Sequence, residues 1–341
     1  MYAIKKAFMT KMIQKKQAKK PFDDEAGENY RLPADTDNTV NNSYYFSAHD
    51  PIGGISFYVR LGVRNCHSEV WFYFADDENS YVLTEMLYKE NAPLKVWRVE
   101  KGWQVEYSGD ALDKSGKRVK VELKGLFVSS ETAIDFFSHM PAVRTATAMA
   151  QEKWNKTFFN EVQKNNQVHY EQLGRFEFKI VIDGKPAEYA LPCVRDHSFG
   201  KRDWNYMNNH LWLMAVSSNE QLNFSMVSYP AMSILEVGNF KAADKMKFVL
   251  KADYDRNVVA KGVNPDNLSL VLTLDDGATL EVKIEKTDEQ TYLFQDGEYR
   301  LIEGIANFTI NGKDFRGILE IGFNGNKERW FNGKSIQKLK V

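Results

Sequence analysis

The feature that most restricts the fold of this chain is an alternation of apolar and polar residues that begins near Ser43 and continues for about ninety residues. Apolar and aromatic runs, such as residues 55–63, 69–75 and 119–128, are separated by polar turns that include DDENS and DKSGK. Successive side chains of a strand point to opposite faces, so a period of two is typical of short strands. Regularly spaced strands of this kind predict an antiparallel sandwich or barrel.

Three tight-turn signals extend this pattern through the second half of the chain. Asp183-Gly184, Asp276-Gly277 and Asn311-Gly312 each lie between two runs of alternating apolar residues. Asp-Gly and Asn-Gly pairs favour two-residue hairpin turns because both residues tolerate positive φ. Consecutive hairpins leave few crossover helices, and the sequence contains neither a Walker loop nor a GxGxxG motif. A nucleotide-binding α/β fold is therefore disfavoured.

One segment interrupts the alternation and suggests a boundary between two halves. Residues 143–163 place apolar side chains four apart, which predicts one helix that packs between or against the sheets. A chain of 341 residues can form two domains of ordinary size. We expect a basic amphipathic segment at 1–20, an acidic linker at 21–41, an N-terminal barrel at 42–165 and a C-terminal barrel at 166–341.

The first twenty residues carry seven lysines and no acidic residue. Apolar side chains recur among them at helical spacing, which is typical of a helix that lies on an anionic membrane surface. The alternative is a frayed and solvated terminus. The apolar residues are Ile4, Phe8, Met9, Met12 and Ile13.

Composition excludes several classes of function. With 45 basic and 46 acidic residues, the chain lacks the net positive charge of a nucleic-acid binder. Cys66 and Cys193 lie far apart, so neither a disulfide framework nor a thiolate metal site is indicated, and a reducing compartment fits best. No apolar run approaches the ~18 residues of a membrane span, and residues 1–20 lack a signal-peptide pattern. We expect a cytoplasmic protein, with peripheral membrane contact through residues 1–20 as the added possibility.

The charged segment from Arg195 to Asp203 is the one most suited to chemistry. One hypothesis makes His197 a general acid at the mouth of an apolar cavity, with Asp196 fixing its tautomer. The other makes Asp196, Arg202 and Asp203 an ionic staple between the two halves, with His197 uninvolved.

A metal site is a third hypothesis. His197 and His210 are thirteen residues apart, and His49 could join them. No HExxH or HxH spacing supports this arrangement, so we predict neither a metal nor a cofactor.

Three stretches carry a resemblance to a known group of proteins. Residues 169–204 (HYEQLGRFEFKIVIDGKPAEYALPCVRDHSFGKRDW) resemble the opening of the C-terminal half of the carotenoid 1,2-hydratase, tocopherol-cyclase-like and survival-factor-like group of double-lipocalin proteins. Residues 41–64 are similar to the first barrel of that group and residues 303–323 to its closing hairpin. The resemblance covers about residues 41–341.

The resemblance implies an all-β fold of two tandem lipocalin-like antiparallel barrels with one or two helices and a ligand site between or within them. Family members hydrate or cyclise isoprenoids, and survival-factor relatives are associated with lipid handling at membranes. Phe199 stands where the hydratases place a tryptophan, and Tyr229 has no acidic companion on its strand. The residues that match the family core are Asp196, His197, Gly200, Arg202 and Asp203.

Three hypotheses for function follow. The first is binding or transfer of a hydrophobic small molecule, a lipid or an isoprenoid, in an apolar cavity. The second is a hydratase, cyclase or isomerase with catalytic residues His197, Asp196 and Tyr229. The third is a structural or interaction module whose barrels are filled by their own side chains. The residues expected at a ligand are Phe199, Trp204, Arg202, Asp203, His49 and Trp212.

Overall fold

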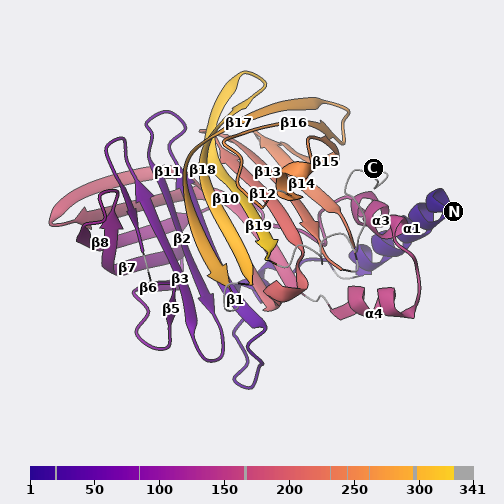
Figure 1. Ribbon diagram of the computed structural model, residues 1–341, viewed down its shortest axis with the longest axis horizontal. Coiled ribbons are helices and arrows are strands. Elements are labelled where there is room, and N and C mark those ends of the chain that lie inside the picture. Colours follow the sequence, from indigo (N-terminus) through magenta and orange to yellow (C-terminus); the bar gives the residue numbers. More distant parts are fainter. Residues whose placement is uncertain are drawn as a thin grey trace.

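Two ring-shaped antiparallel sheets lie side by side, and three helices gather at one end of the molecule (Figure 1). The computed structural model describes residues 1–19, 21–83, 85–164, 167–230, 232–243, 245–260, 262–294 and 298–325. The helices at the end are α1 (Tyr2–Lys19), α3 (Ala142–Gln151) and α4 (Lys156–Lys164).

The first sheet has eleven strands. Its main path runs β11-β1-β2-β3-β4-β7-β8-β10, and pairing of β10 with β11 closes the ring. Three short strands pair at its margins: β5 with β3, β6 with β7, and β9 with β10. The strands are β1 (Val40–His49), β2 (Ser56–Val63), β3 (Ser68–Ala75), β4 (Ser80–Val82), β5 (Leu87–Tyr88), β6 (Leu94–Val99), β7 (Gly102–Asp113), β8 (Arg118–Val128), β9 (Ile134–Asp135), β10 (Gln167–Ile182) and β11 (Lys185–Lys201).

The second sheet is a closed eight-stranded barrel in which each strand pairs with the next and β19 returns to β12. A 3₁₀ turn, η1 (Trp204–Tyr206), leads into it, and α5 (Asn257–Ala260) connects two of its strands. The strands are β12 (Asn209–Val216), β13 (Glu220–Ser228), β14 (Leu235–Ala242), β15 (Lys245–Asp253), β16 (Asn267–Leu274), β17 (Thr279–Phe294), β18 (Tyr299–Ile310) and β19 (Lys313–Asn324).

The expected all-β fold of two lipocalin-like barrels is therefore confirmed. Two of the three expected two-residue turns form: Asp183 and Asn311 have φ of 47° and 48°, and the glycine after each has φ of 80°. Asp276-Gly277 instead lies in a four-residue loop, 275–278, in which only the glycine has positive φ. Two successive residues with positive φ define the type I′ turn, whose twist matches that of the flanking strands.

The division between the sheets differs from the one expected near residue 165. Both β10 and β11 hydrogen-bond within the first sheet, where β11 pairs with β1 and β10 with β8. The chain passes to the second barrel only between Lys201 and Asn209. The boundary moves because β11 pairs with β1 and so completes the first sheet. These two strands lie far apart in sequence, so their pairing leaves no local sequence pattern. Residues 326–341 of the expected second barrel lie outside the described range.

The helix expected over 143–163 forms as two helices, α3 and α4. Helix α3 ends where Glu152 adopts an extended backbone conformation. The Trp154 indole then donates to the Met149 carbonyl at 2.8 Å. The Asn155 side chain then accepts from the Phe158 amide at 2.8 Å, which is the bond of a helix N-cap. This cap starts a new helix where a continuous one was expected.

Burial differs between strands at the junction of the rings and strands at their free sides. In β8 and β16, buried and exposed residues alternate, as expected when only one face is covered. In β1, β2, β3 and β12 almost every residue is buried. These strands face their own barrel core on one side and the other barrel on the opposite side. In addition to the core inside each barrel, the two rings share an apolar cluster at their junction, which includes Trp71, Trp212 and Tyr292.

The acidic segment after α1 does more than link. A short helix, α2 (Asp24–Glu28), starts at the cap of Asp23 and places Glu28 against the first barrel. Glu28 accepts from the Trp103 indole at 2.8 Å, from the Tyr170 hydroxyl at 3.0 Å and from the Arg195 guanidinium. Arg195 is 1% exposed, so Glu28 neutralises a charge that would otherwise be buried alone.

We predict that Glu28→Gln destabilises the protein by on the order of 3 kcal/mol, because it leaves the Arg195 charge without its counterion. Glu25→Gln on the same helix is the matched control, since Glu25 pairs with Arg98 at the surface, where solvent screens the ion pair. Urea unfolding measures both free energies. Equal effects of the two substitutions would contradict this role for Glu28.

Candidate functional site

Strand alternation sorts the charged segment onto two faces of the first barrel. On β10 and β11, Tyr170, Arg195 and His197 point inward, and Glu171 and Asp196 point outward toward the second barrel. Neighbours in sequence on a strand lie on opposite faces. Asp196 and His197 are therefore not partners, and the expected Asp196–His197 pair does not form.

His197 is enclosed within the first barrel. Its Nδ1 lies 2.6 Å from the Tyr170 hydroxyl and its Nε2 lies 2.8 Å from the Asn42 side-chain oxygen. Its ring stacks on Tyr44 at 4.3 Å. Burial, with help from the Arg195 charge, lowers the pKa of His197 to about 3. A neutral imidazole with both nitrogens engaged is not a general acid near neutral pH.

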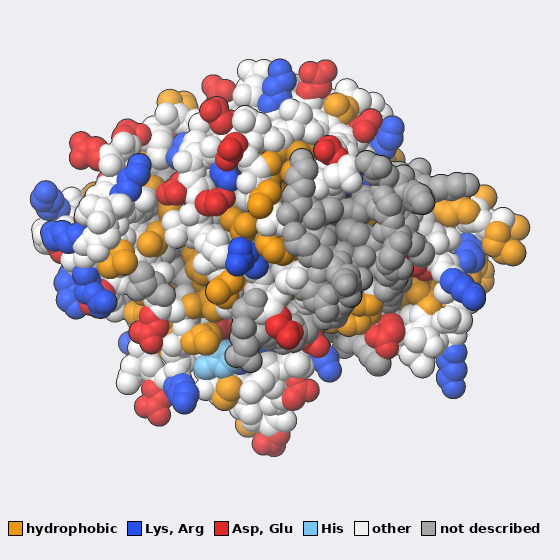
Figure 2. Space-filling view, in the orientation of Figure 1, with side chains coloured by type: hydrophobic (Ala, Val, Ile, Leu, Met, Phe, Trp, Pro, Cys, Tyr) orange, Lys and Arg blue, Asp and Glu red, His pale blue; other side chains and the backbone are white. Residues whose placement is uncertain are grey.

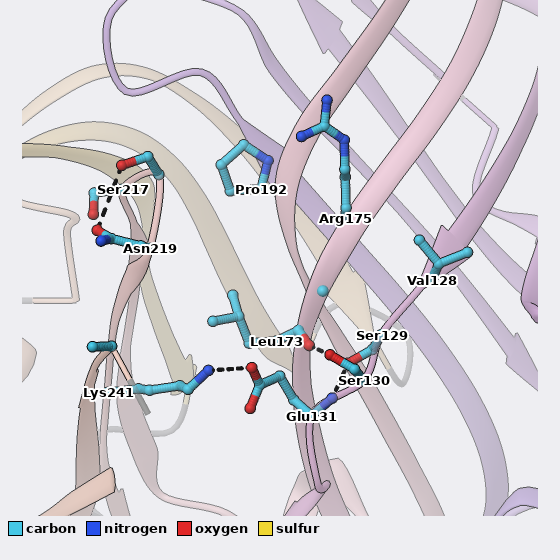
Figure 3. Close-up of a pocket in the computed structure, with 13 residues that line it drawn as sticks. Val128, Ser129, Ser130, Glu131, Leu173, Arg175, Pro192, Ser217, Asn219 and Lys241 are labelled. Carbon is cyan, nitrogen blue, oxygen red and sulfur yellow. Dashed lines mark hydrogen bonds and ion pairs between the residues drawn. The ribbon is translucent and has the colours of Figure 1, made fainter. Parts of the chain in front are cut away.

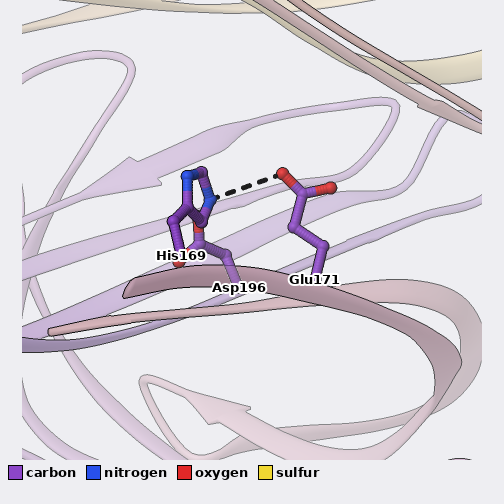
Figure 4. A group of neighbouring side chains, drawn as sticks. All are labelled: His169, Glu171 and Asp196. Carbon is purple, nitrogen blue, oxygen red and sulfur yellow. Dashed lines mark ion pairs between the residues drawn. The ribbon is translucent and has the colours of Figure 1, made fainter. Parts of the chain in front are cut away.

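On the outward face, Asp196 contacts a different histidine. His169 Nε2 lies 2.5 Å from Asp196 Oδ2 and 3.6 Å from Glu171 Oε1 (Figure 4). Burial opposes a charge on His169, but the two carboxylates outweigh it and raise the pKa of His169 to about 10. Burial raises the pKa of Glu171, whereas the facing His169 lowers the pKa of Asp196 despite burial. The three side chains form a partly buried ion triad with a proton on His169.

The same three side chains could also hold a metal. Each offers one ligand atom, and these atoms lie within 4.8 Å of one another. Imidazole and carboxylate ligands suit divalent cations such as Zn²⁺ or Mn²⁺. The sequence hypothesis grouped His197, His210 and His49 instead. The signal that was missed is the i, i+2 spacing of His169 and Glu171 on a strand that faces Asp196 across the hairpin.

The remaining predicted residues divide between several places. Arg202 lies 5.1 Å over the Trp204 ring, and Trp204 stacks on Phe294 of the second barrel at 4.5 Å. The Trp212 indole donates to Asn223 at 3.1 Å on the outer face of the second barrel. Trp204 and Trp212 both belong to the apolar cluster between the barrels.

Other members of the predicted set have further aromatic or polar partners. Phe199 stacks on Tyr30 at 4.0 Å, and Tyr229 stacks on Tyr206 at 5.6 Å. Asp203 is half-buried in the turn between β11 and η1.

His49 lies at the opposite end of β1 from Asn42, the strand residue that contacts His197. It is held between Ser47 and Ser56, at 2.7 and 3.1 Å. The structure thus does not gather the predicted residues into one site.

Sequence reasoning missed a buried acid pair between the barrels. Glu303 and Glu320 face each other on β18 and β19, and the Tyr45 hydroxyl donates to Glu303 at 2.5 Å. His210 bridges Glu320 at 2.5 Å and the Tyr299 hydroxyl at 2.6 Å. Burial raises the pKa of both carboxyl groups, most strongly for Glu303, and lowers the pKa of His210 to about 3. Burial in such surroundings favours the neutral, protonated form of a carboxyl group.

An open cleft lies between the two barrels. It has a volume of about 620 Å³, and Lys241 of β14 pairs with Glu131 of the first domain across it, at 2.5 Å (Figure 3). A second cavity of about 20 Å³ shares Glu131, Leu173 and Lys241 with the cleft and reaches Glu171. It has room for about one water molecule. The cleft is lined by Val128, Ser129, Ser130, Glu131, Leu173, Gly174, Arg175, Pro192, Ser217, Ser218, Asn219, Lys241 and Ala243.

Comparison with known proteins places the chain in a family. The model of a family described as a domain of unknown function, DUF7064, matches residues 24–325. This chain belongs to the DUF7064 family. No curated protein sequence matches it.

Two solved structures resemble this DUF7064 protein. A candidate AttH protein from Nitrosomonas europaea has a TM-score of 0.51 at 11% identity, and the match covers 86% of this chain and 96% of that one. Kievitone hydratase from Nectria haematococca has a TM-score of 0.52 at 12% identity, covering 88% and 94%. At these identities the likeness shows the fold alone. That fold is the double-lipocalin fold expected from the sequence.

We predict that the ion triad makes the stability of the DUF7064 protein fall with rising pH. The pKa of His169 is about 10 in the folded state and about 6.5 in an unfolded chain. The folded state therefore binds the extra proton between these values, and the stabilisation present below pH 6.5 is lost as pH rises toward 10.

Urea unfolding at several pH values measures this slope. His169→Gln removes the component, and His139→Gln, at a half-buried histidine that accepts from the Asp135 amide at 2.9 Å, is the control. The interpretation fails if the wild type and His169→Gln show the same slope between pH 6.5 and 10.

Proposed function

We propose that this protein binds a largely apolar small molecule in the cleft between its two barrels. The observation that carries the proposal is the cleft itself, whose volume of about 620 Å³ lies within the usual range for small-molecule sites. The barrel interiors are occupied by their own buried side chains. The cleft therefore offers more room for a guest than the cores do.

The lining of the cleft suggests the chemistry of the ligand. Val128, Leu173, Pro192 and Ala243 supply apolar surface, and serine and asparagine side chains supply hydrogen bonds. Lys241 is 9% exposed at its side chain and forms the charged inner wall with Glu131. A molecule with an apolar body and one polar group fits this pattern. A lipid or an isoprenoid is the class that the sequence resemblance favours.

We predict that a bulky side chain at the mouth of the cleft weakens this binding. Ser218 lies exposed in the β12–β13 turn that borders the cleft, so Ser218→Trp narrows the entrance. Ser115→Trp, in the exposed β7–β8 turn of the first barrel, is the matched control. Geranylgeraniol and oleic acid serve as probes, with binding followed by isothermal titration calorimetry.

The expected result is one saturable site in the wild type and in Ser115→Trp, with at least about tenfold weaker binding in Ser218→Trp. Solvent extraction of the purified protein followed by mass spectrometry should release a molecule of the same class. Equal affinities in both variants, or no binding and no extracted molecule, would refute the proposal.

A second candidate function is acid catalysis, and the Glu303–Glu320 pair favours it. Protonation of an alkene needs an acid that keeps its proton at neutral pH, and addition of water then returns a proton to the site. Glu303 meets the first requirement better than His197, whose pKa lies near 3. Kievitone hydratase, which has a similar fold, is by name an enzyme.

We predict that an infrared band of a protonated carboxyl group is present at pH 7 and disappears in Glu303→Gln. Glu281→Gln, at an exposed strand position, should leave the band unchanged. A wild-type spectrum without this band would remove the acid-catalysis candidate and leave the binding proposal untouched.

A further inference from the structure

Helix α1 presents an apolar row that the described residues of the protein leave exposed. Ile4, Phe8 and Met12 are 73%, 54% and 50% exposed, and their spacing of four places them on one face of the helix. Isolated exposed apolar side chains are common, but three successive ones on a single helix face form a continuous strip. This strip is called the α1 face below.

The opposite side of α1 fixes the helix to the protein body. Met9 and Ile13 are buried in a cluster with α3. At one end, Lys5 donates to the Glu152 carbonyl at 2.6 Å. At the other end, Gln17 donates to the carbonyls of Phe137 and Met140, at 2.7 and 3.0 Å. Packing on the opposite side of the helix therefore directs the α1 face outward. The side chains of the α1 face are not needed for that packing.

Positive charge accompanies the apolar strip. Lys11, Lys15 and Lys19 follow Ile4, Phe8 and Met12 by seven residues each, which is about two helical turns and returns to the same face. All three lysines are exposed, and α1 contains no acidic residue. Figure 2 shows basic (Lys or Arg) and hydrophobic side chains at the end of the molecule where α1 lies in Figure 1.

Aromatic side chains extend the strip beyond α1. Phe8 lies 6.2 Å from Trp154, which lies 5.6 Å from Phe159, and Phe159 is 36% exposed. Lys5 lies over the Trp154 ring at 4.9 Å. Phenylalanine and tryptophan beside lysine are the residue types that anchor helices in the headgroup region of a bilayer.

We propose that the α1 face docks the protein on a bilayer rich in anionic phospholipids. Lysines within a Debye length of such a surface are attracted to it, and the apolar strip can enter the boundary between headgroups and acyl chains. Charge complementarity favours this occupant over a second copy of the chain, because two α1 faces would bring like charges together. The inference goes beyond the proposed function and stands on different residues.

Flotation of the full-length protein with vesicles tests the proposal. Vesicles of phosphatidylcholine with phosphatidylserine should carry the wild type, and vesicles of phosphatidylcholine alone should carry far less. Raising the salt concentration should reduce binding to the anionic vesicles. The triple variant Lys11→Gln, Lys15→Gln, Lys19→Gln should bind them about a hundredfold more weakly.

The apolar strip is tested separately by Ile4→Ser, Phe8→Ser and Met12→Ser in one variant, which should also lose at least about tenfold in vesicle affinity. The controls change exposed residues elsewhere and should bind like the wild type. They are Lys101→Gln, Lys114→Gln, Lys185→Gln for charge and Ile52→Ser, Val263→Ser, Val271→Ser for apolar surface.

Circular dichroism confirms that each variant retains its fold, which is expected because the buried Met9 and Ile13 are unchanged. Wild-type flotation by either α1 variant would overturn the proposal. Equal binding of the wild type to neutral and anionic vesicles would also overturn it. The proposal also fails if the wild type does not bind vesicles and instead forms a concentration-dependent dimer in sedimentation that the Ile4, Phe8 and Met12 substitutions abolish.

Discussion

The structure depends on the packing of two closed sheets against each other through their outer faces. A closed sheet has no free edge, so its only further way to bury surface is across a face. Strands β1, β2, β3 and β12 are buried on both sides for this reason. The contact is aromatic at its centre, where Trp71 stacks on Tyr292 at 4.1 Å and Tyr58 hydrogen-bonds the same tyrosine at 2.9 Å.

Burial at this junction also decides the charge state of the candidate site. His197 and His169 belong to one hairpin, yet burial beside Arg195 keeps His197 neutral, and two carboxylates keep His169 protonated. Glu303 and Glu320 share the same dry layer and compete for protons. Desolvation strengthens every such interaction and so shifts the pKa values of these groups away from their ordinary values.

The sequence predicted the fold better than the site. Alternation, Asp-Gly and Asn-Gly turns, and the resemblance over residues 41–341 were enough for two lipocalin-like barrels. The runs YYF, VWFYF and HLWLM, apolar at consecutive positions, carried a further signal of strands buried on both faces, which was not used. The pairing of β11 with β1 and the meeting of Glu303 with Tyr45 join distant segments, so no local pattern announces them. Asp196 and His197 are adjacent in sequence, but a strand directs adjacent side chains to opposite faces, so they do not share a site.

The central claim is that the two barrels form one body whose junction holds the site. Differential scanning calorimetry of the intact chain tests it most directly, by comparing the calorimetric and van't Hoff enthalpies of unfolding. If the shared aromatic and ionisable layer joins the barrels, they unfold in one transition with equal enthalpies. Two separate transitions, or a calorimetric enthalpy about twice the van't Hoff value, would mean that the barrels are independent and that their junction cannot hold a fixed site.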